Sequence, residues 1–142
     1  MEQHTGQALT VWVIWLATAL YVAAVAGWLM RQDRLARVLW TAGCGLYVVH
    51  VAGAFQFYHH WSHAAAYRET ARQTLEVVGL NWGGGLYFNY VFTAVWVADV
   101  IWWWRGIETY RRRPRAITIA VHTFMAFMFL NAVLWPFMRL IS

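Results

Sequence analysis

Three histidines that lie close together carry the clearest chemical signal in the sequence. His59, His60 and His63 share a segment of five residues, 59–63. If this segment is helical, His59 and His63 are an i, i+4 pair and His60 and His63 an i, i+3 pair, so each pair lies on one face. Two imidazoles on one helical face can hold one transition-metal ion, as in zinc enzymes with the HExxH motif. The spacing predicts a metal site, with copper, zinc or iron as its ion, since imidazole suits all three.

Other side chains can complete this site. Glu69 follows the histidines and is predicted as a metal ligand with them, and His4, Tyr87 and Asn89 offer further donor atoms. The alternative is that the histidines face lipid headgroups and water beside Trp61, because imidazole has an apolar body and a polar tip. Both interpretations place the segment at a membrane boundary.

His50 precedes the histidine segment and lies deeper in the same apolar stretch. An ionisable group inside a membrane is costly, so it should face the interior of the protein and have a partner. We predict that His50 and Asn89 bind a cofactor. His50 would then ligate a haem b iron or support the outer metal site through a hydrogen bond. The alternative is a neutral core histidine bonded to a backbone carbonyl or to Asn89.

Asp99 and His122 form a second group. Asp99 precedes Arg105, and His122 follows Arg115, by nearly the same number of residues, so the two lie at similar depth on consecutive helices. An aspartate inside a membrane protein usually marks a proton path, an ion pair or a cofactor contact. We predict a catalytic pair in which Asp99 accepts a hydrogen bond from His122, whose other nitrogen binds a cofactor or relays protons. The alternative is a purely structural bond between two helices.

Four long stretches with few charges must position these residues. A helix needs about 20 apolar residues to cross the hydrocarbon core of a bilayer. The sequence therefore predicts an all-α polytopic membrane protein, one domain over residues 1–142, whose four transmembrane helices form an antiparallel bundle. The predicted spans are residues 9–30, 35–58, 85–105 and 116–138.

An additional helix is predicted between the second and third spans, at residues 62–80. Apolar residues recur there at steps of three and four, at Ala64, Tyr67, Ala71, Leu75 and Val78. This period is typical of an amphipathic helix. We expect it on the outer surface of the bundle or as an extension of the second span.

The net charge of +5 comes from arginine alone, since the sequence has no lysine. The two links that should lie on one side of the membrane carry most of it, at Arg31, Arg34, Arg37, Arg105, Arg111, Arg112, Arg113 and Arg115. The positive-inside rule assigns these links to the cytoplasm and both termini to the periplasm, as in a bacterial inner membrane protein. Because topology accounts for the charge, we expect the lipid bilayer and not nucleic acid as partner.

Three functions from different classes follow. The first is a membrane-embedded metalloprotein with its outer site on His59, His60, His63 and Glu69, either redox active or activating oxygen or water for a lipid-soluble substrate. The second is a haem b protein that exchanges electrons with a quinone. His50 and His122 differ in depth by about 10 Å, however, and two axial ligands of one iron need the same level.

The third function is not enzymatic. A small structural subunit of a larger membrane complex, or a proton-coupled carrier that uses Asp99 and His122, also agrees with the sequence. Small residues along the spans favour close helix contacts and hence a homo-oligomer or a larger assembly. Whether the protein is an enzyme is left open by these patterns.

Overall fold

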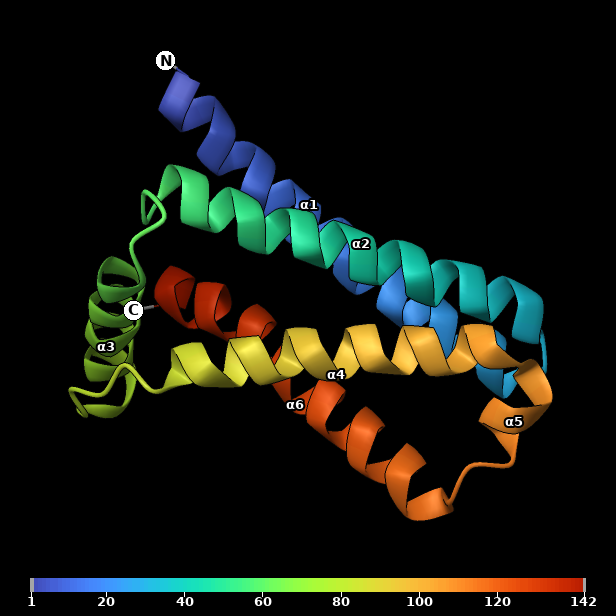
Figure 1. Cartoon of the computed structure of the whole chain (residues 1–142). Coiled ribbons are helices and arrows are strands. Elements are labelled where there is room, and N and C mark those ends of the chain that lie inside the picture. The colour runs from blue at the N-terminus through green and yellow to red at the C-terminus, as the bar shows by residue number, and fades with distance from the viewer. Residues whose placement is uncertain (1, 142) are drawn as a thin grey trace.

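The chain is almost entirely helical. A computed structural model describes the backbone of residues 2–141 and the side-chain surroundings of residues 6, 8, 9 and 11–132. Within residues 2–141 there is no strand, and the prediction of an all-α protein is confirmed. The helices are α1 (Glu2–Leu29), α2 (Asp33–Phe57), α3 (His63–Val78), α4 (Gly85–Arg105), α5 (Ile107–Arg111) and α6 (Arg115–Ile141) (Figure 1).

Four of these helices are long and apolar enough to cross a membrane. The segments with this property in the part of the chain that the structure describes are Val11–Leu29, Asp33–Phe57, Gly85–Arg105 and Arg115–Ala132. They coincide with the four predicted spans to within a few residues. The prediction of four helices that are long and apolar enough to cross a membrane is confirmed.

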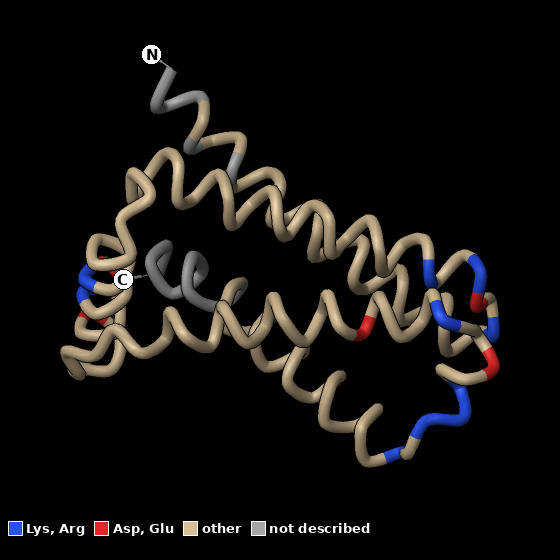
Figure 2. Tube along the Cα trace, in the orientation of Figure 1, with Lys and Arg blue, Asp and Glu red and all other residues tan. Residues whose placement is uncertain are grey.

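The helices are arranged so that the arginine-rich links share one end of the molecule. α1 and α2 lie side by side, α4 runs next to α2, and α6 crosses α4 obliquely (Figure 1). The link between α1 and α2, the short helix α5 and the start of α6 lie at one end, and α3 lies across the other (Figure 2). Positive charge therefore gathers at the end opposite α3.

The helix predicted at residues 62–80 is α3, and local capping sets its ends. The hydroxyl oxygen of Ser62 accepts a hydrogen bond from the backbone N–H of Ala65 at 3.2 Å, as expected of an N-cap serine. Gly79 ends the helix with φ 73°, a left-handed conformation that glycine adopts without steric cost. Sequence signals alone were sufficient to locate this helix.

Large aromatic side chains fill the space between the long helices. Trp40, Trp96, Trp103 and Phe92 are each no more than 2% exposed. The rings of Trp40 and Trp96 lie 5.5 Å apart, tilted against each other, which joins α2 to α4. Trp96 fits against α2 because residue 43 is a glycine: a Cβ there would lie 3.1 Å from Cζ2 of Trp96.

Replacing Gly43 with a larger residue should therefore loosen this contact. We expect Gly43→Leu to destabilise the fold by about 1–3 kcal/mol, the usual cost of overpacking a well-filled core. Loss of helical circular dichroism on heating in detergent measures the effect. Gly45→Leu is the matched control, because a Cβ at position 45 meets nothing within 4 Å. Equal melting temperatures for the two variants would contradict the packing described here.

Candidate functional site

A buried ion pair joins α4 to the segment that follows α5. Asp99 lies on α4 and is 3% exposed, and Arg113, between α5 and α6, is 6% exposed. The guanidinium Nη1 of Arg113 donates to Oδ1 of Asp99. Desolvating two charges is expensive, and the cost is recovered only when geometry and further hydrogen bonds are good. Those further bonds are present.

Tyr110 on α5 completes this cluster. Its hydroxyl donates to Oδ2 of Asp99 at 2.7 Å and accepts from Nη2 of Arg113 at 3.0 Å. Its ring stacks on Trp103 with the centroids 4.3 Å apart and the planes within 3°. Burial, reinforced by the carboxylate of Asp99, raises the pKa of Tyr110, so the hydroxyl stays protonated and continues to donate.

Arg113 also contacts α6 directly. Its Nε donates to the hydroxyl oxygen of Thr118 at 3.0 Å, and its guanidinium lies 4.0 Å from the centroid of the Tyr110 ring. Arg113 therefore contacts residues of α4, of α5 and of the first turn of α6. We refer to Asp99, Tyr110 and Arg113 below as the ionic cluster.

His122 on α6 lies beside the ionic cluster but is not bonded to it. Its ring is 5.5 Å from those of Trp28 and Trp40, and it lies within electrostatic range of Asp99 and Arg113. Both ring nitrogens are buried and have no hydrogen-bond partner among the described residues. The predicted hydrogen bond from His122 to Asp99 is therefore absent, and the carboxylate accepts from Tyr110 and Arg113 instead.

Five more buried polar groups in the described part of the chain have no hydrogen-bond partner. Each is a buried N–H group that bonds to nothing in the described part of the chain: Nε1 of Trp28, Trp40, Trp96 and Trp103, and Nε of Arg37. The Trp28 and Trp40 rings contact the His122 ring, and the Trp40 ring contacts those of Trp96 and Trp103. Buried polar groups in proteins normally bond to protein or to internal water. The interior around His122 thus has donors for small polar molecules.

The outer histidines do not share a helical face. α2 ends at Phe57, and His60 and Trp61 have φ angles of 47° and 58°, which take the chain out of the helix. Of the three histidines only His63 is helical, as the first residue of α3. The prediction of i, i+4 and i, i+3 pairs across residues 59–63 is wrong, because the Ser62 cap starts a new helix inside the segment.

Each outer histidine instead has different surroundings. Nδ1 of His63 lies 3.0 Å from the hydroxyl oxygen of Tyr90, and the two rings stack. Burial lowers the pKa of His59, and the nearby charges of Glu69 and His60 act on it in opposite directions. His59 is therefore neutral, and able to bind a metal, at a lower pH than an unperturbed histidine.

Glu69 is held by Arg72 on the next turn of α3. Arg72 Nη2 lies 2.5 Å from Oε1 of Glu69 and Nε lies 3.0 Å from Oε2, and this bonding lowers the pKa of Glu69. Among the described side chains, no group of three or more His, Cys, Asp or Glu residues is placed to hold a metal ion. The side chain of His4, a further predicted ligand, lies outside the described residues.

The predicted cofactor residues lie at other levels of the molecule. His50 is half-buried on α2 with its ring 6.1 Å from that of Tyr47, and Asn89 is exposed on α4, as is Tyr87. His122 packs against Trp40, two turns of α2 from Tyr47, which amounts to about 10 Å along the helix. His122 and His50 therefore contact rings at different levels of α2.

Sequence reasoning missed Tyr110 and Arg113. A signal for Arg113 existed, because an aspartate inside a membrane needs a cationic partner. Consecutive arginines point in different directions, so one of the three at positions 111–113 was well placed to turn inward. The residues next to Tyr110 in the sequence give no comparable indication of its role.

Comparison with known proteins does not assign the chain to a family. No protein-family model matches the chain, and neither a curated protein nor a solved structure is similar to it. The chemistry of the site must therefore be argued from its own residues.

Removing only one of the two charges of the ionic cluster should lower the free energy of unfolding substantially. We expect Asp99→Asn to lower the stability by about 3–5 kcal/mol, because Arg113 is then a buried charge without a counter-charge. The double variant Asp99→Asn, Arg113→Gln should recover most of this loss, and unfolding in detergent measures both. Glu108→Gln, in the exposed pair with Arg112, is the control and should change stability by less than about 1 kcal/mol. A double variant no more stable than the single one would show that the unpaired charge of Arg113 is not what destabilises the single variant.

Proposed function

We propose that the protein is a small proton-coupled membrane protein, either a carrier or a proton-transferring subunit of a larger complex. Its working groups are the ionic cluster and His122. One observation carries the proposal: a charged pair is buried inside an apolar bundle, within electrostatic range of an imidazole whose two nitrogens have no hydrogen-bond partner among the described residues. Intramembrane ionisable groups of this kind usually serve ion or proton movement.

In the proposed mechanism, Arg113, a protonated His122 and a free proton compete for the carboxylate of Asp99. In an apolar interior the charge of Asp99 needs either a nearby cation or a proton. Arg113 is that cation in the structure, and it lies in a short segment between α5 and α6, at the end of the molecule. If Arg113 moves away, Asp99 either takes up a proton or pairs with a protonated His122. Proton binding and displacement of Arg113 are thereby coupled.

The unpartnered N–H groups support a proton route to this site. The rings of Trp28 and Trp40, whose N–H groups have no partner among the described residues, contact the His122 ring. Water bonded to such donors exchanges protons with an imidazole nitrogen, and histidine changes its charge near neutral pH. We infer that internal water connects His122 with the nearer membrane face.

The same proposal includes a membrane topology. We propose that the four spans cross as an antiparallel bundle, with the arginine-rich end in the cytoplasm and both termini in the periplasm of a bacterial inner membrane. Support comes from the gathering of the arginine-rich links at one end (Figure 2) and from the positive-inside rule. The ionic cluster then faces the cytoplasmic side and α3 lies on the outer surface.

Proton transfer by the reconstituted protein tests the proposal. In liposomes that carry a pH-sensitive dye, with an imposed pH gradient and the electrical potential clamped, the wild-type protein should admit protons. The double variant Asp99→Asn, Arg113→Gln should slow this about a hundredfold, the low end of what a positioned proton-transfer group contributes. Glu108→Gln, Arg112→Gln removes an exposed ion pair and is the matched control. Wild-type flux equal to that of protein-free liposomes would refute proton transfer.

A second candidate function is the predicted metalloprotein, with a redox or oxygen- or water-activating site at the outer end. The observation in its favour is that His59, His60 and Glu69 lie near enough to influence one another electrostatically. A metal would have to compete with Arg72 for the carboxylate, and His63 would have to leave Tyr90. The candidate site is thus less preorganised than the ionic cluster.

Metal analysis of the purified protein tests this second candidate. After growth with added copper, zinc and iron, the wild-type protein should retain roughly one equivalent of a transition metal. His59→Ala, His60→Ala should lose it, and His122→Ala, at the other end of the molecule, should keep it. Because the pKa of His59 is lowered, metal retention should persist to a lower pH than for an unperturbed histidine site. Equal metal content in the wild type and the double variant would rule the site out.

A further inference from the structure

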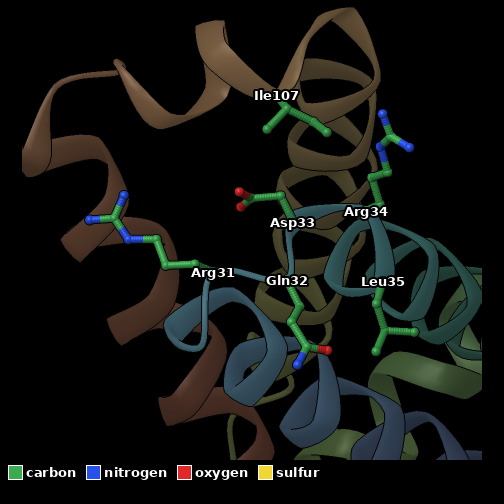
Figure 3. Close-up of a pocket in the computed structure, with 6 residues that line it drawn as sticks. All are labelled: Arg31, Gln32, Asp33, Arg34, Leu35 and Ile107. Carbon is green, nitrogen blue, oxygen red and sulfur yellow. The ribbon is translucent and has the colours of Figure 1, made fainter.

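A shallow basic pocket lies at the link between α1 and α2, outside the ionic cluster. Its volume is about 470 Å³. The side chains that line it are Arg31, Gln32, Asp33, Arg34, Leu35 and Ile107 (Figure 3). Arg31 and Arg34 extend on opposite sides, with Asp33 between them (Figure 3). Nothing in the proton-coupled site uses these residues.

The pocket carries a net positive charge despite Asp33. Arg111 forms an ion pair with Asp33 and so balances the charge of its carboxylate. Nη2 of Arg111 lies 2.6 Å from Oδ1 of Asp33. Arg111 also donates to the carbonyl oxygen of Trp28 at 3.0 Å, so it is fully engaged within the protein. The side chains of Arg31 and Arg34 have no hydrogen bond, ion pair or ring contact with any described residue. Two cations therefore remain for an external anion.

The backbone at Arg31 is itself informative. Its φ of 63° is left-handed, a conformation in which glycine or asparagine is the favoured residue. The turn alone does not call for an arginine. The side chain of Arg31 lines the pocket.

The position of the pocket identifies the kind of anion. It lies between the last residue of one span, Leu29, and the first residue of the next, Asp33, which is the depth of lipid headgroups. Beside the arginines, Leu29 and Met30 are each 68% exposed and Leu35 is 50% exposed. These apolar side chains suit the upper part of an acyl chain, whereas a soluble phosphate would gain nothing from them.

We propose that this pocket binds the headgroup of an anionic phospholipid, with Arg31 and Arg34 flanking the headgroup on opposite sides. Guanidinium groups bind phosphate oxygens through charge-assisted hydrogen bonds, with two parallel N–H groups each. The open shape of the pocket admits a headgroup from the membrane surface, and the apolar rim keeps its chains in the bilayer. The bound lipid fixes the turn between the first two spans at the membrane boundary.

Lipid titration followed by native mass spectrometry tests the proposal. Phosphatidylglycerol and phosphatidylcholine are each added to the full-length protein in detergent. The wild-type protein should bind phosphatidylglycerol more tightly. Arg31→Gln, Arg34→Gln should weaken this binding roughly 30-fold, since each arginine near an anionic lipid contributes a factor of about five. Phosphatidylcholine binding should be nearly unchanged.

The control variant removes the same charge from the same end of the molecule. Arg105 and Arg115 are exposed and have no described partner, so Arg105→Gln, Arg115→Gln should retain lipid binding. Equal losses in the two variants would mean diffuse attraction to the basic end and would overturn the pocket. A further arm adds inorganic phosphate as competitor. If phosphate displaces the lipid at concentrations similar to those of the lipid itself, the pocket is a site for soluble anions, and the lipid assignment is wrong.

Discussion

The ion pair between Asp99 and Arg113 is the interaction on which the rest of the site depends. Neither charge can remain alone in an apolar bundle, so the pair brings the segment after α5 into the interior and holds it against α4. Tyr110 then stacks on Trp103, and Thr118 anchors the first turn of α6. Because α6 crosses α4 obliquely (Figure 1), this anchor determines where α6 starts and hence where His122 lies.

Packing elsewhere follows from the absence of a hydrophobic driving force within lipid. Apolar helices gain little by leaving acyl chains for one another, so they associate where shapes fit closely. Gly43 receives the edge of Trp96, and Ala17, Ala24 and Ala36 are buried between α1 and α2. Aromatic rings fill the remaining interior and leave several indole N–H groups without protein partners among the described residues. The aromatic interior therefore contains buried N–H groups that have no partner among the described residues.

The fold was largely predictable from sequence, and the site was predictable only in part. The lengths of the spans depend on local composition, and the ends of α3 depend on Ser62 and Gly79. The spans and α3 can therefore be recognised from the sequence alone. The histidine segment was misjudged because the same Ser62 cap interrupts the helix that its spacing required. The importance of Asp99 was visible from its depth. The need for a cationic partner was also visible, but which of the three arginines at positions 111–113 supplies it depends on how the chain turns through α5.

The arginines, which look equivalent in sequence, have separate tasks in the structure. Arg113 is buried as a counter-charge, Arg111 closes the turn between α1 and α2 by bonding Asp33 and Trp28, and Arg37 lies 4.1 Å from the Trp104 ring. The side chains of Arg31 and Arg34 line the pocket at the same end (Figure 3) and have no partner among the described residues. If the positive-inside rule were the sole requirement, exposed arginines would be sufficient. That several are instead inside the protein or bonded within it implies that charge at this end organises the interior as well as the orientation. If both proposals hold, a single end of the molecule combines a proton-responsive interior with a surface for anionic lipid.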